Sequence, residues 1–135
     1  MIVGLGTDLV ELSGFSSQLD DAASHFTRRT FTADEVTYCQ GAISRQPTRH
    51  LAARYAAKEA AIKALDVACV RLGIEPSSLD YREIEVCRDD RGRPSLRLHG
   101  DAAKLADEVG ADRAWVTLSH DGDYATAVVL FERIR

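Results

Sequence analysis

The segment from Arg54 to Leu65 constrains the fold of this chain more than any other. It is rich in alanine, contains neither glycine nor proline, and therefore predicts a strong helix. This apolar helix also carries four charged residues: Arg54, Lys58, Glu59 and Lys63. Glu59 shares a helix flank with Tyr55 and Ile62, which we expect to be buried. A carboxylate there requires a partner, a metal or a proton. The nearby cations could form ion pairs with it, or could attract an anionic phosphate ligand.

The length and composition predict one domain over residues 1–135 with its own hydrophobic core. No run approaches the roughly 20 apolar residues that a membrane helix needs. The N-terminus lacks the basic segment of a signal peptide. Three widely spaced cysteines favour neither a disulfide framework nor a zinc site: Cys39, Cys69 and Cys87. We therefore expect a cytoplasmic protein with free thiols and no membrane partner.

The net charge of −4 argues against a general nucleic-acid binder. The distribution of charge is uneven, because the segment from Arg45 to Lys63 contains six basic or histidine residues and the single acid Glu59. Such a local field would attract phosphates or an acidic protein surface. The alternative interpretation is a solvated helix face, which is the more common meaning of a basic run.

The periodicity of the chain changes from helical in the first half to strand-like in the second. A strand is predicted over 2–12, where Gly4 and Gly6 indicate close approach of another backbone. Helices are predicted over 14–26, over 32–38 from a capping box, over 48–70 with an end near Gly73, and over 101–109. Residues 41–47 are predicted to form a loop. Further strands are predicted over 81–88, 95–99, 114–119 and 124–131, the first two as a hairpin. The fold class is α+β, a mostly antiparallel sheet packed on one long helix.

Asp8 lies in an apolar strand behind two glycines and has two interpretations. An isolated aspartate at a strand end usually accepts hydrogen bonds from nearby backbone amides. It is also a hard oxygen ligand of the kind that Mg²⁺ prefers, and Mg²⁺ typically takes one or two protein carboxylates together with substrate phosphate. Asp8 and Glu59, both embedded in apolar sequence, would together suit such a site.

The run Ser119, His120 and Asp121 suggests a hydrolase, but neighbouring residues of a strand point to alternate faces and cannot form a triad. The nucleophile-elbow pattern is also absent, so nucleophilic hydrolysis is not favoured. His120 either forms hydrogen bonds within the turn that follows it or donates a hydrogen bond to a phosphate. The segment Gly92, Arg93 and Pro94 is by default a hairpin turn, whose glycine would also let a flat ligand ring approach the backbone. P-loop, dinucleotide-binding and zinc-protease motifs are absent.

Taken together, these segments resemble the holo-acyl-carrier-protein synthase family, the small single-unit type of 4′-phosphopantetheinyl transferase. The resemblance runs nearly end to end, through residues 4–11 (GLGTDLVE), 31–35 (FTADE), 51–60 (LAARYAAKEA), 63–65 (KAL), 84–86 (IEV), 92–94 (GRP), 118–120 (LSH) and 123–125 (DYA). The first segment and the AAKE helix at this spacing form a specific signature, whereas each alone would be weak.

The resemblance implies the 4′-phosphopantetheinyl transferase fold and transfer of 4′-phosphopantetheine from coenzyme A to a serine of an apo acyl carrier protein, with 3′,5′-ADP as the other product. It implies that Asp8 and Glu59 bind Mg²⁺ and that Lys63 contacts the pyrophosphate. Arg54 and His120 would hold phosphates of the nucleotide, and the turn Gly92, Arg93 and Pro94 would lie by the adenine. Family members of this length usually form homotrimers with coenzyme A at subunit interfaces, and they serve fatty acid biosynthesis and lipid metabolism.

The chemistry agrees with these residue types, because phosphoryl-type transfer asks mainly for positioning and charge neutralisation. The attacking serine belongs to the partner, so this chain needs no nucleophile. Its proton would go to a metal-bound water or to Glu59, and the sequence does not choose between them.

Gly14 departs from the family, which often has an arginine there that contributes to carrier-protein docking. Docking would then rely on other cations, such as Arg28, Arg29, Arg45 or Arg49, or the partner would differ, for example a carrier domain of a fatty acid synthase. Two alternatives remain open: a Mg²⁺-dependent nucleotide pyrophosphate hydrolase and a non-catalytic module that binds coenzyme A.

Overall fold

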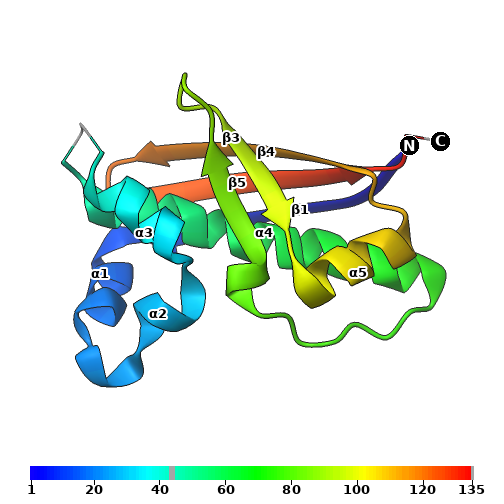
Figure 1. The fold of residues 1–135 in the computed structure, drawn as a ribbon, viewed down its shortest axis with the longest axis horizontal. Helices are drawn as coiled ribbons and strands as arrows, with labels where there is room; N and C mark the ends of the chain where they lie inside the picture. Colours follow the sequence, from blue (N-terminus) through cyan, green and yellow to red (C-terminus); the bar gives the residue numbers. More distant parts are fainter. Residues whose placement is uncertain (43–44, 135) are drawn as a thin grey trace.

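The computed structural model describes residues 1–42 and 45–134. Figure 1 shows its elements, which run in the order β1 (Ile2–Glu11), α1 (Leu12–Asp20), η1 (Ala22–Ser24), α2 (Phe26–Thr30), α3 (Ala33–Gln40), α4 (Pro47–Leu72), η2 (Tyr81–Glu83), β2 (Ile84–Arg88), β3 (Pro94–Leu98), α5 (Gly100–Val109), β4 (Arg113–Asp121) and β5 (Tyr124–Glu132). Elements η1 and η2 are single turns of 3₁₀ helix. Within the described residues, no helix is both long and apolar enough to cross a membrane.

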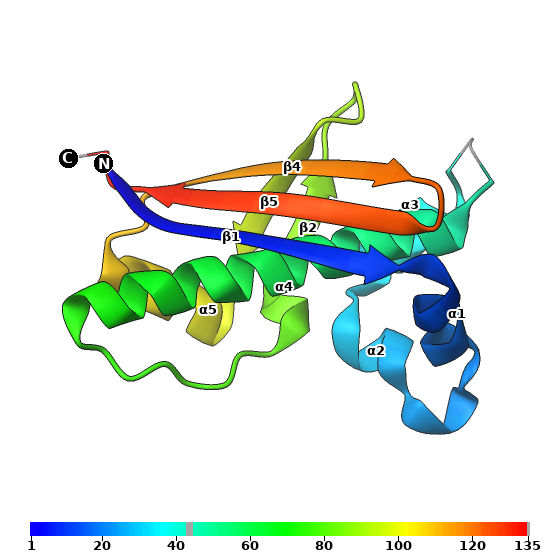
Figure 2. The ribbon, with the colours of Figure 1, turned by 180° about the vertical axis from the view of Figure 1, so that it is seen from behind.

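The strands form two antiparallel sheets against one long helix. The first sheet has the order β1-β5-β4, and β2 and β3 form a separate hairpin that stands beside β4. Helix α4 runs beneath the first sheet for most of its length (Figure 2). Its buried face is built mainly from alanines, which let the sheet approach closely. The predicted α+β class, with a mostly antiparallel sheet on one long helix, is confirmed.

Strand β1 lies directly on α4 because it contributes glycines at the contact. A Cβ atom on Gly4 would lie 2.1 Å from the carbonyl oxygen of Ala64, and one on Gly6 would lie 2.0 Å from that of Ala60. Side chains cannot occupy such positions, so the two backbones can meet only where glycine is present. The predicted close approach is therefore confirmed, and it fixes Asp8 against the helix.

Three helix boundaries follow from local sequence signals. Thr32 accepts a hydrogen bond from the backbone of Glu35, whose side chain accepts one from the backbone of Thr32, and this capping box begins α3. Helix α4 begins at Pro47, which was predicted to lie in the loop, because proline suits the first helical turn. It ends at Leu72, before Gly73 in the left-handed conformation. Residues 43–44 of the predicted loop lie outside the described residues.

The predicted helix over 14–26 is wrong in extent. Helix α1 ends at Asp20, because the side chain of Asp21 accepts a hydrogen bond from the backbone of Ala23 and starts the turn η1 instead. The chain then reverses at His25, which has a left-handed φ of 54°. The predicted strand over 81–88 also starts later, since Asp80 accepts from the backbone of Arg82 and caps η2.

Candidate functional site

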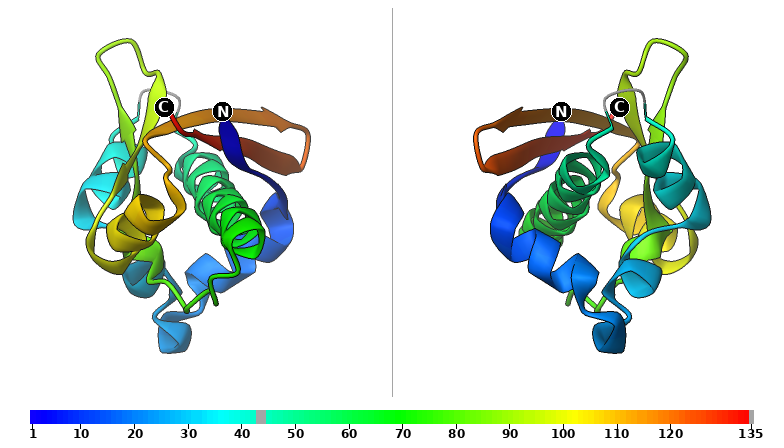
Figure 3. Two further views of the ribbon diagram at one scale, coloured as in Figure 1. Left: turned by 90° about the vertical axis from the view of Figure 1, so that its right-hand side faces the viewer. Right: turned by 90° about the vertical axis from the view of Figure 1, so that its left-hand side faces the viewer.

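Helix α4 carries charged residues on two different flanks. At 3.6 residues per turn, side chains five positions apart, such as Arg54 and Glu59, point about 140° apart around the axis. Viewed along α4, β1 lies on one side of the helix and the β2–β3 hairpin on the other (Figure 3). Glu59 faces the β1 side and Arg54 the hairpin side, because they line different pockets.

The first pocket, which we call the carboxylate pocket, is an open cavity of about 420 Å³ lined by β1, α1 and α4. Its acidic residues are Asp8 from the middle of β1, Glu11 from its end and Glu59 from α4. At its edge, Nζ of Lys63 lies 3.0 Å from Oδ1 of Asp8 and 3.0 Å from the carbonyl oxygen of Thr7. Asp8 therefore has a cation as its partner, and the interpretation as a strand-end aspartate bonded to amides is wrong.

Glu59 is held by a tyrosine rather than by a cation. The hydroxyl of Tyr81 donates a hydrogen bond of 2.6 Å to Oε1 of Glu59. The ring of Tyr81 stacks on that of Tyr55, with centroids 5.8 Å apart and planes 28° apart. Burial and the bond to Glu59 raise the pKa of Tyr81 to about 12, so the phenol remains a donor at neutral pH. The expectation that nearby cations form ion pairs with Glu59 is wrong.

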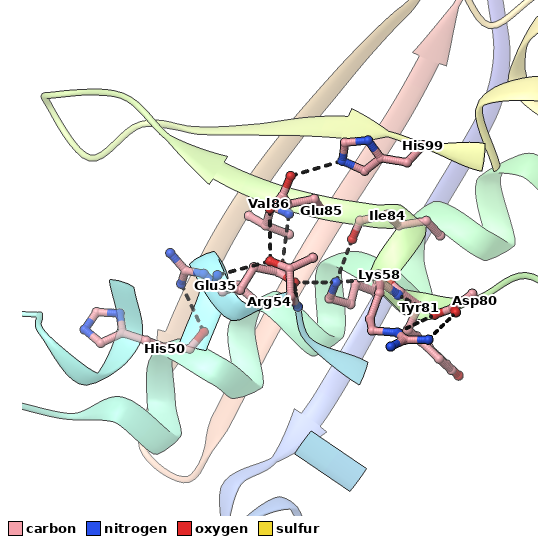
Figure 4. Close-up of polar contacts among 12 residues, drawn as sticks. Glu35, His50, Arg54, Lys58, Asp80, Tyr81, Ile84, Glu85, Val86 and His99 are labelled. Carbon is pink, nitrogen blue, oxygen red and sulfur yellow. Dashed lines mark hydrogen bonds and ion pairs between the residues drawn. The ribbon is translucent and has the colours of Figure 1, made fainter. Parts of the chain in front are cut away.

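Lys58, next to Glu59 in sequence, points to the other side of α4 and is fully buried. Its Nζ donates to Oε1 of Glu35 at 2.8 Å, to the carbonyl oxygen of Tyr81 at 2.9 Å and to that of Ile84 at 2.7 Å. Glu35 also accepts from the backbone of Val86, at 3.0 Å. Figure 4 shows this network between α3, α4 and the start of β2. The interpretation of the basic run as a solvated helix face is therefore wrong for Lys58.

The second pocket, which we call the arginine pocket, is a cavity of about 190 Å³ between α3, α4 and the β2–β3 hairpin. It is lined by the guanidinium groups of Arg54, Arg88 and Arg97 and also by the carboxylates of Asp34, Glu35 and Glu85. Arg54 is fully buried, stacks over the ring of Tyr38 at 4.8 Å and donates to the carbonyl oxygen of His50. Among the described residues, its Nε and Nη2 have no hydrogen-bond partner. Buried guanidinium nitrogens without partners are costly, which makes this pocket a candidate site for an anion.

His120 and the hairpin turn belong to the arginine side of the molecule. His120 is exposed near the end of β4. The pKa of His50 is lowered by burial and also by the nearby charges of Arg54, Arg88 and His120. Arg88 donates to the carbonyl oxygen of Gly92, which joins the turn to the pocket. The turn itself is as predicted: Gly92 has a left-handed φ of 77°, and Pro94 begins β3.

Within one chain, the structure thus brings Asp8, Glu59 and Lys63 together but keeps Arg54, His120 and the turn at Gly92 apart from them. No group of three or more His, Cys, Asp or Glu residues able to hold a metal is present in the described ranges. A metal in the carboxylate pocket would therefore need oxygen ligands from a substrate or from water as well.

Two residues at these pockets were not predicted from the sequence: Tyr81, which contacts Glu59, and Arg88, which lines the arginine pocket. Tyr81 lies 22 positions from Glu59, and no local pattern links them. Arg88 has a buried Nε without a partner in the described part of the chain, and it was treated only as part of an alternating strand. Its position just before the turn at 89–94 was the one available signal, since a strand end beside a ligand-facing turn is well placed to reach the ligand.

Comparison with known proteins identifies the family. A family model described as the 4′-phosphopantetheinyl transferase superfamily matches residues 4–129. A holo-[acyl-carrier-protein] synthase of Geobacter sulfurreducens is 39% identical over 98% of this chain and 99% of its own length. One of Nocardia farcinica is 44% identical over 97% of this chain and 88% of its own.

Solved structures give the same result. The chain is similar to an ACPS–CoA complex of Chronobacterium ammoniagenes, with a TM-score of 0.82 and 40% identity over 98% of both chains. It is also similar to a holo-[acyl-carrier-protein] synthase of Neisseria meningitidis, with a TM-score of 0.80 and 29% identity over 98% of this chain and 100% of that one. The resemblance noted in the sequence is confirmed. The chain belongs to the 4′-phosphopantetheinyl transferase superfamily, in its holo-acyl-carrier-protein synthase family.

Proposed function

We propose that this chain, acting as one domain in the cytoplasm, transfers 4′-phosphopantetheine from coenzyme A to a serine of an apo acyl carrier protein or carrier domain for fatty acid biosynthesis, and releases 3′,5′-ADP. The full-length similarity to synthases of this name, and to a structure titled as a complex with CoA, supports this activity. The observation that carries the proposal is the pairing of an acidic pocket with a separate pocket built around a buried, unsatisfied arginine. These are the two environments that a metal-bound pyrophosphate and a phosphorylated nucleotide require.

The carboxylate pocket fits Mg²⁺ by its chemistry. Asp8 and Glu59 supply hard oxygen ligands at one open cavity. Their neighbours each engage one carboxylate oxygen, Oδ1 of Asp8 and Oε1 of Glu59, and a carboxylate has a second oxygen to offer. When bound, Mg²⁺ would neutralise charge on the pyrophosphate and on the leaving nucleotide.

Lys63 is suited to assist at the pyrophosphate. Its side chain is 53% exposed, and its ammonium group uses one of three donors on Asp8 and one on the carbonyl oxygen of Thr7, which leaves one for a phosphate. It would therefore keep the aspartate oriented, and would present positive charge towards the leaving group. The attacking hydroxyl would come from the carrier protein, so this chain would need no nucleophile of its own.

The arginine pocket is the proposed site for phosphates of the nucleotide. Arg54 is buried with two unpaired guanidinium nitrogens, so an anion there would gain charge-assisted hydrogen bonds without first displacing a protein partner. Arg88 adds a second guanidinium, whose Nε is buried without a partner among the described residues, and His120 is an exposed imidazole on the same side of the molecule. The turn of Gly92, Arg93 and Pro94 would lie by the adenine, where its glycine leaves space open on the Cβ side.

We further propose that the chain forms a homotrimer in which coenzyme A lies between subunits. On the outer face of the first sheet, Leu5, Leu130 and Trp115 align across three strands, and Val128 lies in the next row. Leu5 is 54% exposed and Trp115 53% exposed, so this face is apolar and uncovered in a single chain. Light scattering should give the mass of three chains, and Val128→Glu should give the mass of one; a wild type with monomer mass would refute the trimer.

Docking of the carrier protein is proposed to use basic residues around α2 and the start of α4. Gly14 lies in α1 with open space around it and offers no charge. Arg28, Arg29 and Arg45 are exposed and Arg49 is partly exposed, so an acidic carrier protein could reach them. Reversing these four charges should raise the KM for the carrier protein and leave that for coenzyme A unchanged. An unchanged KM for carrier protein would exclude this surface.

The decisive experiment is intact mass spectrometry of an apo acyl carrier protein after incubation with this protein, coenzyme A and Mg²⁺. A mass gain equal to phosphopantetheine, lost with EDTA and with Asp8→Ala, is expected. Cleavage of coenzyme A without a mass gain would instead indicate the pyrophosphate hydrolase. Intact coenzyme A with every carrier tested, including carrier domains of fatty acid synthases, would indicate a binding module.

A further inference from the structure

We propose that Tyr81 is a positioning residue for the metal site: its hydroxyl holds the Glu59 carboxylate in the orientation that binds the divalent cation. This inference rests on the proposed Mg²⁺ role of Asp8 and Glu59. The bond between the Tyr81 hydroxyl and Oε1 of Glu59, at 2.6 Å, is a short charge-assisted hydrogen bond. It connects the carboxylate to a part of the chain that is distant in sequence and lies outside α4.

Glu59 needs such a partner because its own side chain is flexible. A glutamate has three rotatable bonds, and one that stays only partly buried loses little by moving into solvent. Asp8 is shorter and is restrained by Lys63 at 3.0 Å. Glu59 has no cation in hydrogen-bond range among the described residues. The phenols of Tyr55 and Tyr81 are both beside its carboxylate, and Tyr81 makes the 2.6 Å bond to Oε1. Fixing one oxygen leaves the other to point into the pocket.

Tyr81 is itself held rigidly, which a positioning residue requires. Its ring stacks on Tyr55, which precedes Glu59 by one helical turn. Its carbonyl oxygen accepts a hydrogen bond of 2.9 Å from the buried Lys58, and Lys58 is in turn bonded to Glu35 (Figure 4). The buried ion pair on one flank of α4 therefore fixes the backbone that places the hydroxyl on the other flank. Metal-site carboxylates commonly depend on outer partners of this kind.

The test compares Tyr81→Phe with the wild-type protein. The phenylalanine keeps the ring and its stacking on Tyr55 and removes only the hydroxyl, so the fold is retained. Tyr124→Phe, which removes an exposed phenol hydroxyl at the start of β5, is the matched control. Binding is measured with Mn²⁺ as the probe, by the electron paramagnetic resonance signal of the free ion, on the full chain without carrier protein. Carrier modification is measured separately as a function of Mg²⁺.

Tyr81→Phe is expected to bind Mn²⁺ about tenfold more weakly, and Tyr124→Phe to bind it like the wild type. The Mg²⁺ concentration for half-maximal transfer should rise by a similar factor, whereas kcat at saturating Mg²⁺ should stay within about twofold. The thermal unfolding midpoint without metal should stay within about 2 °C, which separates positioning from a structural role.

Two results would overturn the inference. If Tyr81→Phe binds Mn²⁺ as tightly as the wild type while Asp8→Ala abolishes binding, the metal site stands and Tyr81 does not position it. If the wild type binds no Mn²⁺ and transfers phosphopantetheine in EDTA, the metal site fails and this inference fails with it, although the transferase does not. A wild type that binds Mn²⁺ but modifies no carrier protein would contradict the proposed function alone, because the Mn²⁺ comparison still decides the role of Tyr81.

Discussion

Replacing Lys58 by methionine should destabilise the protein strongly, although the change looks mild on an alanine-rich helix. Methionine has a similar length and is a good helix former. The substitution removes three hydrogen bonds at once, to Glu35, to the carbonyl of Tyr81 and to the carbonyl of Ile84. It also leaves Glu35 buried without its cation; among the residues that the structure describes, the donors left to it are the backbone amides of Thr32 and Val86.

The magnitude follows from the burial of both partners, whose side chains are 0% exposed. Removing one member of a buried ion pair typically costs about 3–5 kcal/mol. For a chain of this length, that cost corresponds to a fall in the unfolding midpoint of roughly 10–20 °C. Burial lowers the pKa of Lys58 and the Glu35 carboxylate opposes this effect, so the ion pair offsets part of the desolvation of the ammonium group.

The assay is denaturant unfolding followed by circular dichroism, at one fixed protein concentration because assembly would couple to folding. Lys104→Met is the matched control: Lys104 is an exposed lysine on α5, 3.8 Å from Asp101, and its loss should change stability by less than about 0.5 kcal/mol. The double variant of Lys58→Met with Glu35→Gln should recover part of the loss, because no unpaired charge remains. A loss below about 1 kcal/mol for Lys58→Met alone would refute the argument that this pair holds α3, α4 and β2 together.

Two further predictions concern packing and pH. Gly6→Ala should lower the free energy of unfolding by about 3 kcal/mol or more, because the new Cβ would lie 2.0 Å from the carbonyl oxygen of Ala60. Gly14→Ala is the control: its Cβ would meet nothing within 4 Å, so this change should be neutral or stabilising. Equal thermal midpoints for the two variants would contradict this prediction. Burial raises the pKa of the Cys39 thiol from 9.0 to about 11, so stability should fall between these pH values, where the unfolded thiol ionises and the folded one does not. Denaturant midpoints across this pH window should show a smaller fall for Cys39→Ala, and parallel curves would show that Cys39 does not contribute.

The sequence predicted those parts of the fold that depend on neighbouring residues. The capping box at Thr32, the left-handed end of α4 at Gly73 and the turn at Gly92 are all set by local backbone chemistry. The predicted helix over 14–26 was wrong because the side-chain bond of Asp21 to a nearby amide competes with helical bonding, and composition alone does not reveal which wins.

The partners of the charged residues could not be predicted in the same way. Lys58 and Glu59 are adjacent, yet Lys58 pairs with Glu35 and Glu59 with Tyr81, both more than 20 positions away. Such partners depend on how η2 and α3 pack against α4, which is a tertiary property. The same packing buries Arg54 and leaves it partly unpaired, a feature that no pattern in residues 45–63 indicates.

The separation of Arg54 and Glu59 on α4 leads to a test of the proposed trimer. In a cyclic trimer with coenzyme A between subunits, each site takes its arginine pocket from one chain and its carboxylate pocket from the next. Arg54→Leu and Glu59→Gln should each inactivate the homotrimer. Every trimer that contains both variants, however, has one interface at which the Glu59→Gln chain supplies an intact Arg54 and the Arg54→Leu chain next to it supplies an intact Glu59. Random co-assembly should therefore restore about a quarter of the wild-type rate. No recovery in co-expressed trimers, together with full folding of each variant, would mean that one chain supplies both pockets to the same ligand.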